Sequence, residues 1–225
     1  DLGPMKRPLL WLLWGWMAAV IVAAFHWAPL AEGFLGQSSR ILFFHVPMAW
    51  VSFVAFMTAG VGSLAYLAGR RTEQRDQAAA AAIEIGLLFA LLATVTGAIW
   101  ARIMWNSWWN WDPRQASIVV ALLFYAAYLA LRAAVADREA RGRLCAAYAT
   151  LGLVVAPFFS FVLPRLGFTL HPEAVINAQG KVEVEPRMLA VLLASSAGFT
   201  ALFFWMHRLR TRLALREARL LEGSD

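Results

Sequence analysis

Cysteine and charge are both scarce in this sequence of 225 residues. The single cysteine, Cys145, excludes an intramolecular disulfide, and we expect no thiol chemistry from it. Charged residues make up 15% of the chain, against roughly 25% in soluble domains, so water is not its main solvent. The sequence also lacks a nucleotide-binding motif, so any use of ATP would belong to a partner.

What the sequence has instead is long apolar runs, which contribute to a hydrophobic content of 61%. A helix that crosses about 30 Å of hydrocarbon needs roughly 20 apolar residues, and six runs reach or approach that length. We therefore predict an all-α integral membrane protein, a single six-helix transmembrane bundle over residues 1–225, with no separate soluble domain. The predicted spans are Leu9 to Pro29, Ile41 to Gly69, Ala78 to Ala101, Ala116 to Ala136, Leu144 to Leu163 and Met188 to Met206.

The first run could be mistaken for a signal peptide, because Lys6 and Arg7 precede it. Its length and its tryptophans Trp11, Trp14 and Trp16 are not typical of one, so we expect a retained helix. The four residues before Met5 look like a remnant of expression and carry no structural prediction.

The distribution of lysine and arginine predicts the orientation. Cytoplasmic loops carry the excess of these residues, and 14 of the 20 lie at the two ends of the chain and in the loops near Arg70 and Arg138. Both termini are therefore expected inside, and the loops around Arg40, Trp105 and His171 outside. The net charge of +6 fits this bias and an affinity for anionic lipid, with no need for nucleic acid.

The predicted fourth helix has a strong start signal on the outer side. Asp112 is placed at the N-cap, Pro113 at the first helical position and Gln115 at the third, just before an apolar run. We therefore expect a rigid cap that anchors the preceding loop close to the membrane surface.

That loop is rich in tryptophan, with five of the eleven between Trp100 and Trp111. An interfacial aromatic belt is the simpler interpretation. Five tryptophans in twelve residues exceed what anchoring needs, however, and in a helix Trp105, Trp108 and Trp109 would share one face. We therefore favour an aromatic platform that binds a ligand.

Two of the four histidines flank this platform on the outer side. His45 stands at the start of the second span and His171 in the last outer loop, whereas His26 and His207 are expected to be ordinary interfacial residues. Either of the first two alone would more often be structural. Together they suit a large planar cofactor whose metal needs two axial ligands, a description that haem matches.

Charged residues near these histidines complete the candidate site. Haem propionates favour arginine, and Arg114, two residues beyond the cap, is the best placed of Arg40, Arg102, Arg114 and Arg165. Contact with lipid phosphates is an equal alternative for each arginine. Glu84 is a carboxylate inside a span, with no partner evident at matching depth, and its role is left open.

The stretch Trp105-Asn-Ser-Trp-Trp-Asn-Trp-Asp112-Pro-Arg-Gln-Ala-Ser117 resembles the tryptophan-rich WWD signature of haem-handling proteins in bacterial cytochrome c biogenesis. With six spans, His45 in a His-Val-Pro context and His171 in the last outer loop, the whole chain is similar to the CcmC family. The resemblance implies a WWD loop at about 100–117 and an outer loop at about 164–187, in a multi-pass protein of the bacterial inner membrane.

The resemblance further implies a haem transfer protein that is not an enzyme. It would hold non-covalent haem b at the outer face with His45 and His171 as axial ligands to the iron, and deliver it to the haem chaperone CcmE. Other implied partners are the ABC transporter subunits CcmA and CcmB and the small protein CcmD. The residues carried over as haem-binding are His45, His171, Trp105, Trp108, Trp109, Trp111 and Asp112, with Arg114 added from the charge argument.

The match is not complete, and two alternatives remain. Asn106 stands where the family commonly has Gly, and Pro113 and Gln115 replace residues that are often Ala and Leu, which affects the expected fit to the chaperone more than haem binding. A haem lyase of the WWD type is the first alternative, although it would be longer. The second is a membrane subunit of a haem or ABC export complex that binds no haem.

Overall fold

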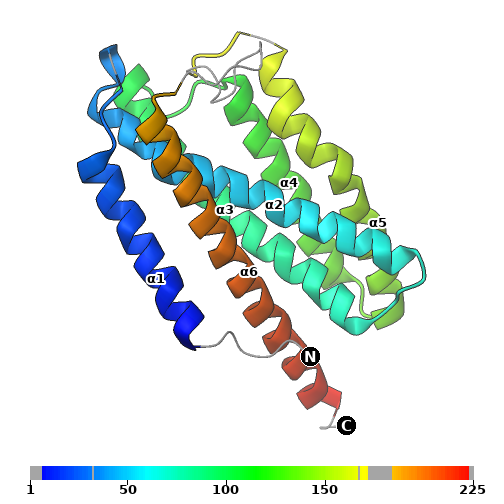
Figure 1. The fold of residues 1–225 in the computed structure, drawn as a ribbon. Coiled ribbons are helices and arrows are strands. Elements are labelled where there is room, and N and C mark those ends of the chain that lie inside the picture. Colours follow the sequence, from blue (N-terminus) through cyan, green and yellow to red (C-terminus); the bar gives the residue numbers. More distant parts are fainter. Residues whose placement is uncertain (1–6, 32, 167, 172–183, 223–225) are drawn as a thin grey trace.

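The computed structural model describes residues 7–31, 33–166, 168–171 and 184–222. Six of its helices are long and apolar enough to cross a membrane, which confirms the predicted all-α, six-span architecture. Figure 1 shows them as one elongated bundle. The helices are α1 (Arg7–Val22), α2 (Leu42–Leu67), α3 (Glu73–Trp105), α4 (Pro113–Ala134), α5 (Arg138–Pro157) and α6 (Pro186–Glu222).

Short irregular turns extend these helices at one end of the bundle. A π turn, Ala23–Trp27, continues α1, and a 3₁₀ turn, Gln37–Ile41, leads into α2. The helix α5 continues through a π turn, Phe158–Val162, and a 3₁₀ turn, Leu163–Arg165. We call this end the loop end, and the opposite end, where α1 begins and α6 finishes, the terminal end (Figure 1). Most of the predicted outer loop lies outside the described residues.

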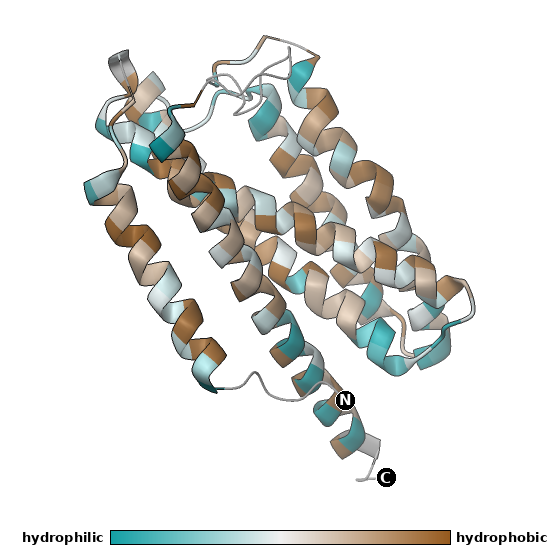
Figure 2. Cartoon of the chain, in the orientation of Figure 1, coloured by the Kyte–Doolittle hydropathy of each residue, from teal (hydrophilic) through white to brown (hydrophobic). Residues whose placement is uncertain are grey.

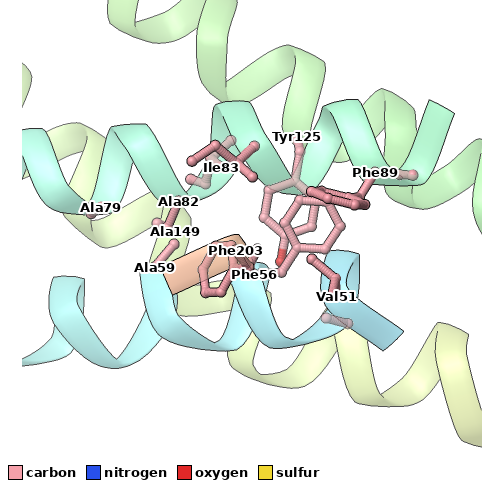
Figure 3. Packing of buried hydrophobic residues seen from close by; sticks show 14 of the residues in the cluster. Val51, Phe56, Ala59, Ala79, Ala82, Ile83, Phe89, Tyr125, Ala149 and Phe203 are labelled. Atoms are coloured by element: carbon pink, nitrogen blue, oxygen red, sulfur yellow. The ribbon is translucent and has the colours of Figure 1, made fainter. Parts of the chain in front are cut away.

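The helix α2 lies at the centre of the bundle, packed against α3, α5 and α6. Its Phe56 stacks on Tyr125 of α4 with ring centroids 3.6 Å apart and planes 8° from parallel. Figure 3 shows these rings beside Phe89 and Ile83 of α3, so hydrophobic packing joins the middle of three helices. By contrast, α1 contacts the bundle mainly along α6. A rigid α2–α3–α4 core therefore supports whatever is built at the loop end.

Pro47 lies inside α2 rather than in its first turn. The 3₁₀ turn carries the chain into α2 earlier, so the helix starts at Leu42 and Pro47 lies inside it. Proline has no N–H, which leaves the carbonyl of Phe43 without its intrahelical partner. The Ser195 hydroxyl of α6 donates a hydrogen bond to that carbonyl at 2.5 Å. The proline thus creates a polar link between α2 and α6.

Ion pairs join the helices towards the terminal end. Arg132 of α4 forms two hydrogen bonds to the carboxylate of Asp76, at 2.8 and 2.7 Å. Glu84, for which no partner was evident from sequence, pairs with Arg210 of α6, whose Nε lies 2.6 Å from Oε2. The pair was not evident from the sequence because α6 continues beyond the predicted end of the sixth span at Met206. Arg210 lies in this continuation, beside Glu84 of α3. Figure 2 shows the hydrophilic residues gathered at the bundle ends and along the last turns of α6.

Candidate functional site

The tryptophan loop is not helical, which corrects one expectation. The helix α3 ends at Trp105, where Asn106 takes the left-handed conformation with φ 54°, and Trp111 has the same φ. Asparagine tolerates that conformation better than most residues, so it terminates α3 as a C-cap. The condition under which Trp105, Trp108 and Trp109 would share one helical face is therefore not met.

The predicted cap of α4 is confirmed. The Oδ1 atom of Asp112 accepts a hydrogen bond from the backbone N–H of Arg114 at 3.0 Å, and Pro113 takes the first helical position. Gln115 completes a capping box, because its Oε1 accepts hydrogen bonds from the N–H groups of Asn110 and Asp112. One side chain thus fixes the end of the tryptophan loop to the start of the helix.

Asp112 has a second role that the sequence did not indicate. Its side chain is fully buried, and its Oδ2 accepts hydrogen bonds from the Thr169 hydroxyl at 2.8 Å and the Leu170 N–H at 2.7 Å. Its Oδ1 lies 2.8 Å from Nδ1 of His171, although the direction falls short of a straight hydrogen bond. A single carboxylate therefore holds both the start of α4 and the segment that carries His171.

The charges of this pair follow from its surroundings. Burial tends to raise the pKa of Asp112, but hydrogen bonds from Arg114, Thr169 and Leu170 outweigh it and leave the pKa below its usual range. Burial lowers the pKa of His171, and the attraction of Asp112 only partly offsets this. At neutral pH the aspartate is therefore ionised and the imidazole neutral. In the neutral His171 ring, the proton then lies on Nδ1, the nitrogen next to the carboxylate, and Nε2 keeps a lone pair.

His45 is held against α3 in a comparable way. Its Nδ1 lies 3.0 Å from Oγ1 of Thr96, and that hydroxyl donates its own proton to the carbonyls of Leu92 and Ala93. With the hydroxyl proton directed at these carbonyls, Thr96 accepts from His45, an arrangement in which Nδ1 carries the proton and Nε2 the lone pair.

Gly97 makes this approach possible. A Cβ atom at that position would lie 2.9 Å from Cε1 of His45, closer than carbon atoms can pack. The missing side chain lets the imidazole rest directly on the α3 backbone.

The tryptophans surround His171 at different angles. The Trp100 ring stacks on the imidazole with centroids 6.1 Å apart, and Trp105 meets it edge-on at 5.0 Å. Trp109 and Trp111 pack edge to face, and Trp108 and Trp111 are exposed. The loop thus forms a set of crossed rings rather than a flat platform, and of the loop tryptophans only Trp109 lines the cavity described next, together with Trp100 of α3.

A cavity of about 1690 Å³ opens at the loop end, and both His45 and His171 line it. Its walls come from α2 to α6 and from the turns that precede α2, so residues distant in sequence meet there. It continues along α6 as far as Thr200 and Phe204, within the span. The volume exceeds the 300–1,000 Å³ typical of small-molecule pockets. The two imidazoles are close enough for the charge of one to act on the other.

Cations on the cavity wall are well placed for an anionic group. Arg114 and Arg165 both line it, and their charges act on each other. The Nε of Arg114 is buried and has no hydrogen-bond partner among the described residues. Arg102 bonds instead to its own loop at Asn106, and Arg40 to the carbonyl of Ala24. Arg114 therefore offers a buried donor on the cavity wall that no described residue uses.

The side chains on the cavity wall distinguish a site for a bare metal ion from a site for haem. Within the described ranges no three His, Cys, Asp or Glu side chains gather as they would around a bare metal ion. The described cavity instead has two imidazoles on its wall, the type of ligand that haem iron takes. His26, by contrast, is exposed, and Nε2 of His207 donates a hydrogen bond to the Ala78 carbonyl at 2.8 Å.

Several residues that line the cavity or support its histidines carried no sequence signal that could have found them. Thr96 and Gly97 are common residues of an apolar helix, and Thr169 lies in a short polar stretch. Trp100 was counted among the tryptophans but not selected, because it lies inside the third span.

Comparison with known proteins places the chain in a family. The model of the family described as "CcmC: Heme exporter protein C" matches residues 3–223. The chain is 35% identical over 190 residues to Heme exporter protein C of Paracoccus denitrificans, covering 82% of this chain and 76% of the relative. It is 33% identical over 189 residues to the Bradyrhizobium diazoefficiens protein of the same name, covering 83% of this chain and 71% of the relative. It is 31% identical over 226 aligned positions to the Escherichia coli K12 protein, covering 94% of this chain and 90% of the relative. The chain therefore belongs to the Heme exporter protein C (CcmC) family.

Proposed function

We propose that this protein binds haem in the loop-end cavity and hands it to a haem chaperone during cytochrome c maturation. The observation that carries the proposal is the matched state of His45 and His171. Each imidazole has an oxygen of a fixed neighbour close to its Nδ1, Thr96 at 3.0 Å for His45 and Asp112 at 2.8 Å for His171, and keeps the Nε2 lone pair for the shared cavity. Axial coordination of iron requires such a neutral nitrogen with a fixed tautomer.

The rest of the cavity suits the remaining parts of a haem. Trp100 and Trp109 on its wall offer apolar and stacking contacts for the ring. The unpaired donor of Arg114, next to Arg165, would take a propionate in a bidentate hydrogen bond. The haem would be b-type and non-covalent, since the lone Cys145 is buried in a helix that begins at the terminal end.

The orientation belongs to the same proposal. With both termini on the cytoplasmic side of the bacterial inner membrane, the loop end and its cavity face the periplasm. The basic residues at the terminal end support this, as does the start of α1 and the finish of α6 at one end of the bundle (Figure 1).

The partners follow from membership of the family. Heme exporter protein C is the name of the relatives, and we propose that this chain works with the ABC transporter subunits CcmA and CcmB, the small protein CcmD and the chaperone CcmE. Its own role would be transfer rather than catalysis.

The test is the visible absorption spectrum of the purified protein and of four histidine variants. Two axial imidazoles give a low-spin, six-coordinate haem, so His45→Ala and His171→Ala should each lower haem occupancy or change the spectrum. His26→Ala and His207→Ala should do neither. Added imidazole should restore the six-coordinate spectrum to the first two variants if ligation is what was lost.

An unaltered spectrum and full transfer to the chaperone in His45→Ala or His171→Ala would refute the proposed ligands. Purified wild-type protein that retains no haem would instead favour a membrane subunit that binds none.

A further inference from the structure

We infer that the two histidines are unequal ligands, and that His45 is the one released when an incoming ligand takes the haem iron, while His171 stays bound. The inference rests on the proposed function, because it concerns the order of events at the same iron. It is carried by the different acceptors behind the two imidazoles, a hydroxyl behind His45 and a buried carboxylate behind His171.

The acceptor behind His45 is weak. Oγ1 of Thr96 is neutral and already donates its proton to backbone carbonyls of its own helix, at 2.8 and 3.1 Å. It fixes the tautomer of His45 by accepting a hydrogen bond from Nδ1–H, but it polarises that N–H bond only weakly. The Nε2 lone pair therefore keeps roughly the basicity of a free imidazole.

The acceptor behind His171 is strong. Asp112 is a carboxylate whose side chain is fully buried, and its Oδ1 lies 2.8 Å from the imidazole Nδ1. A carboxylate behind a metal-bound histidine polarises the N–H group and raises the basicity of the ligand nitrogen, and loss of such a partner typically weakens metal binding 10- to 100-fold. The iron bond to His171 should therefore be the stronger of the two.

The carboxylate also holds His171 mechanically. Its Oδ2 accepts from Thr169 and Leu170, the two residues before the histidine, so the segment is tied to the start of α4. The release of His171 would require these contacts to move as well. His45 needs only to lose its iron bond, because its ring remains supported by Thr96 and the bare backbone at Gly97.

Ligand exchange under this inference is balanced. The lone pair of the incoming ligand forms a bond to iron as the bond from iron to Nε2 of His45 breaks. His45 keeps its Nδ1 proton throughout and leaves as a neutral imidazole. The haem remains attached through His171 while the new bond forms.

The experiment identifies the histidine that leaves. Ferric haem-loaded protein is treated with cyanide, which displaces one axial ligand, and after removal of the excess it is exposed to diethyl pyrocarbonate. Carbethoxylation of each histidine is then measured by mass spectrometry and divided by its value in the haem-free protein. We expect both to be protected before cyanide. After cyanide, His45 should be modified about tenfold more than His171.

Two variants test the cause. Asp112→Asn preserves a good N-cap residue, but its amide presents the ring with either a neutral oxygen or an N–H group that reverses the tautomer. The preference for His45 should fall to about twofold or less. Thr96→Val removes the weak acceptor from His45, so it should leave the preference intact or increase it.

The outcomes separate the two proposals. Equal modification of both histidines after cyanide, or preferential modification of His171, would overturn the inference while leaving haem binding intact. A preference unchanged in Asp112→Asn would overturn the assigned cause. Absence of protection of either histidine before cyanide would remove the two-histidine coordination itself, and the ordering with it.

Discussion

Asp112 and His171 come from different segments of the chain, yet Oδ1 and Nδ1 lie 2.8 Å apart. The aspartate of the tryptophan signature is therefore not only a helix cap. It accepts from the backbone of α4, from Thr169 and from Leu170 with the same two oxygens. This arrangement explains why a dense tryptophan stretch ends in an acid: the acid positions a histidine that the sequence places far away.

The loop tryptophans should differ in their effect on haem. Trp109 lines the cavity, whereas its neighbour Trp108 is 58% exposed and does not. Aromatic pairs contribute about 0.5–1.5 kcal/mol beyond area burial, so Trp109→Ala should weaken haem retention by about 2- to 12-fold. Trp108→Ala, the matched control, should retain haem like the wild type. Haem dissociation to an acceptor such as apomyoglobin measures both, and equal losses would assign the two residues to a common anchoring role.

Gly97 should be intolerant of a side chain because of its contact with His45. The Cβ of Gly97→Ala would lie 2.9 Å from Cε1, so the imidazole must move away from α3. We expect a loss of low-spin haem that added imidazole restores. Gly62→Ala on α2 is the control, since its Cβ would have no neighbour within 4 Å, and alanine favours a helix by about 1 kcal/mol over glycine. A normal spectrum for Gly97→Ala would contradict the close packing.

Arg114 should contribute through its unused donor. Hydrogen bonds to charged groups are worth about 1.5–3 kcal/mol, so Arg114→Gln should weaken haem affinity by about 10- to 150-fold. Arg114→Lys should fall between, because it keeps the charge but loses the planar fork. Arg102→Gln should have little effect, since Arg102 is engaged with Asn106. Titration with mesohaem and its dimethyl ester provides the measurement: the ester should bind the wild type and Arg114→Gln alike.

The Glu84–Arg210 pair should stabilise the fold without affecting haem. Their side chains are 34% and 39% exposed, so the coupling is expected at the level of a partly solvated pair, about 0.5–1 kcal/mol. A double-mutant cycle with Glu84→Gln and Arg210→Gln, followed by unfolding in mixed micelles, measures it. Additive effects of the two substitutions would mean that the pair contributes nothing.

The proposed orientation predicts the behaviour of fusions at the C-terminus. A green fluorescent protein fused after Asp225 should fluoresce, because that reporter folds when it remains in the cytoplasm, whereas alkaline phosphatase fused there should be inactive. The reverse pattern would place the cavity on the cytoplasmic side and contradict the delivery of haem to the outer face.

The sequence alone was sufficient to predict the six spans, because an unbroken apolar run of about 20 residues has the length and composition of a transmembrane helix. It was also sufficient for the cap of α4, since the Asp112, Pro113 and Gln115 spacing is a local signal that packing does not need to decide. The same local logic failed in the tryptophan loop. Asn106 ends α3 in a left-handed conformation, so Trp105, Trp108 and Trp109 do not share the face that they would have in a helix.

Only the tertiary structure decided how the histidines are supported. The partners of His45 and His171 are a threonine on α3 and an aspartate before α4, and no spacing in the sequence pairs them. The Glu84–Arg210 pair likewise depends on tertiary structure, because it forms where α3 and α6 pack side by side. Hydrophobic length and helix capping are properties of contiguous residues, so a sequence displays them. A second partner for a buried polar group depends on which helices pack together, and that is determined by the whole bundle at once.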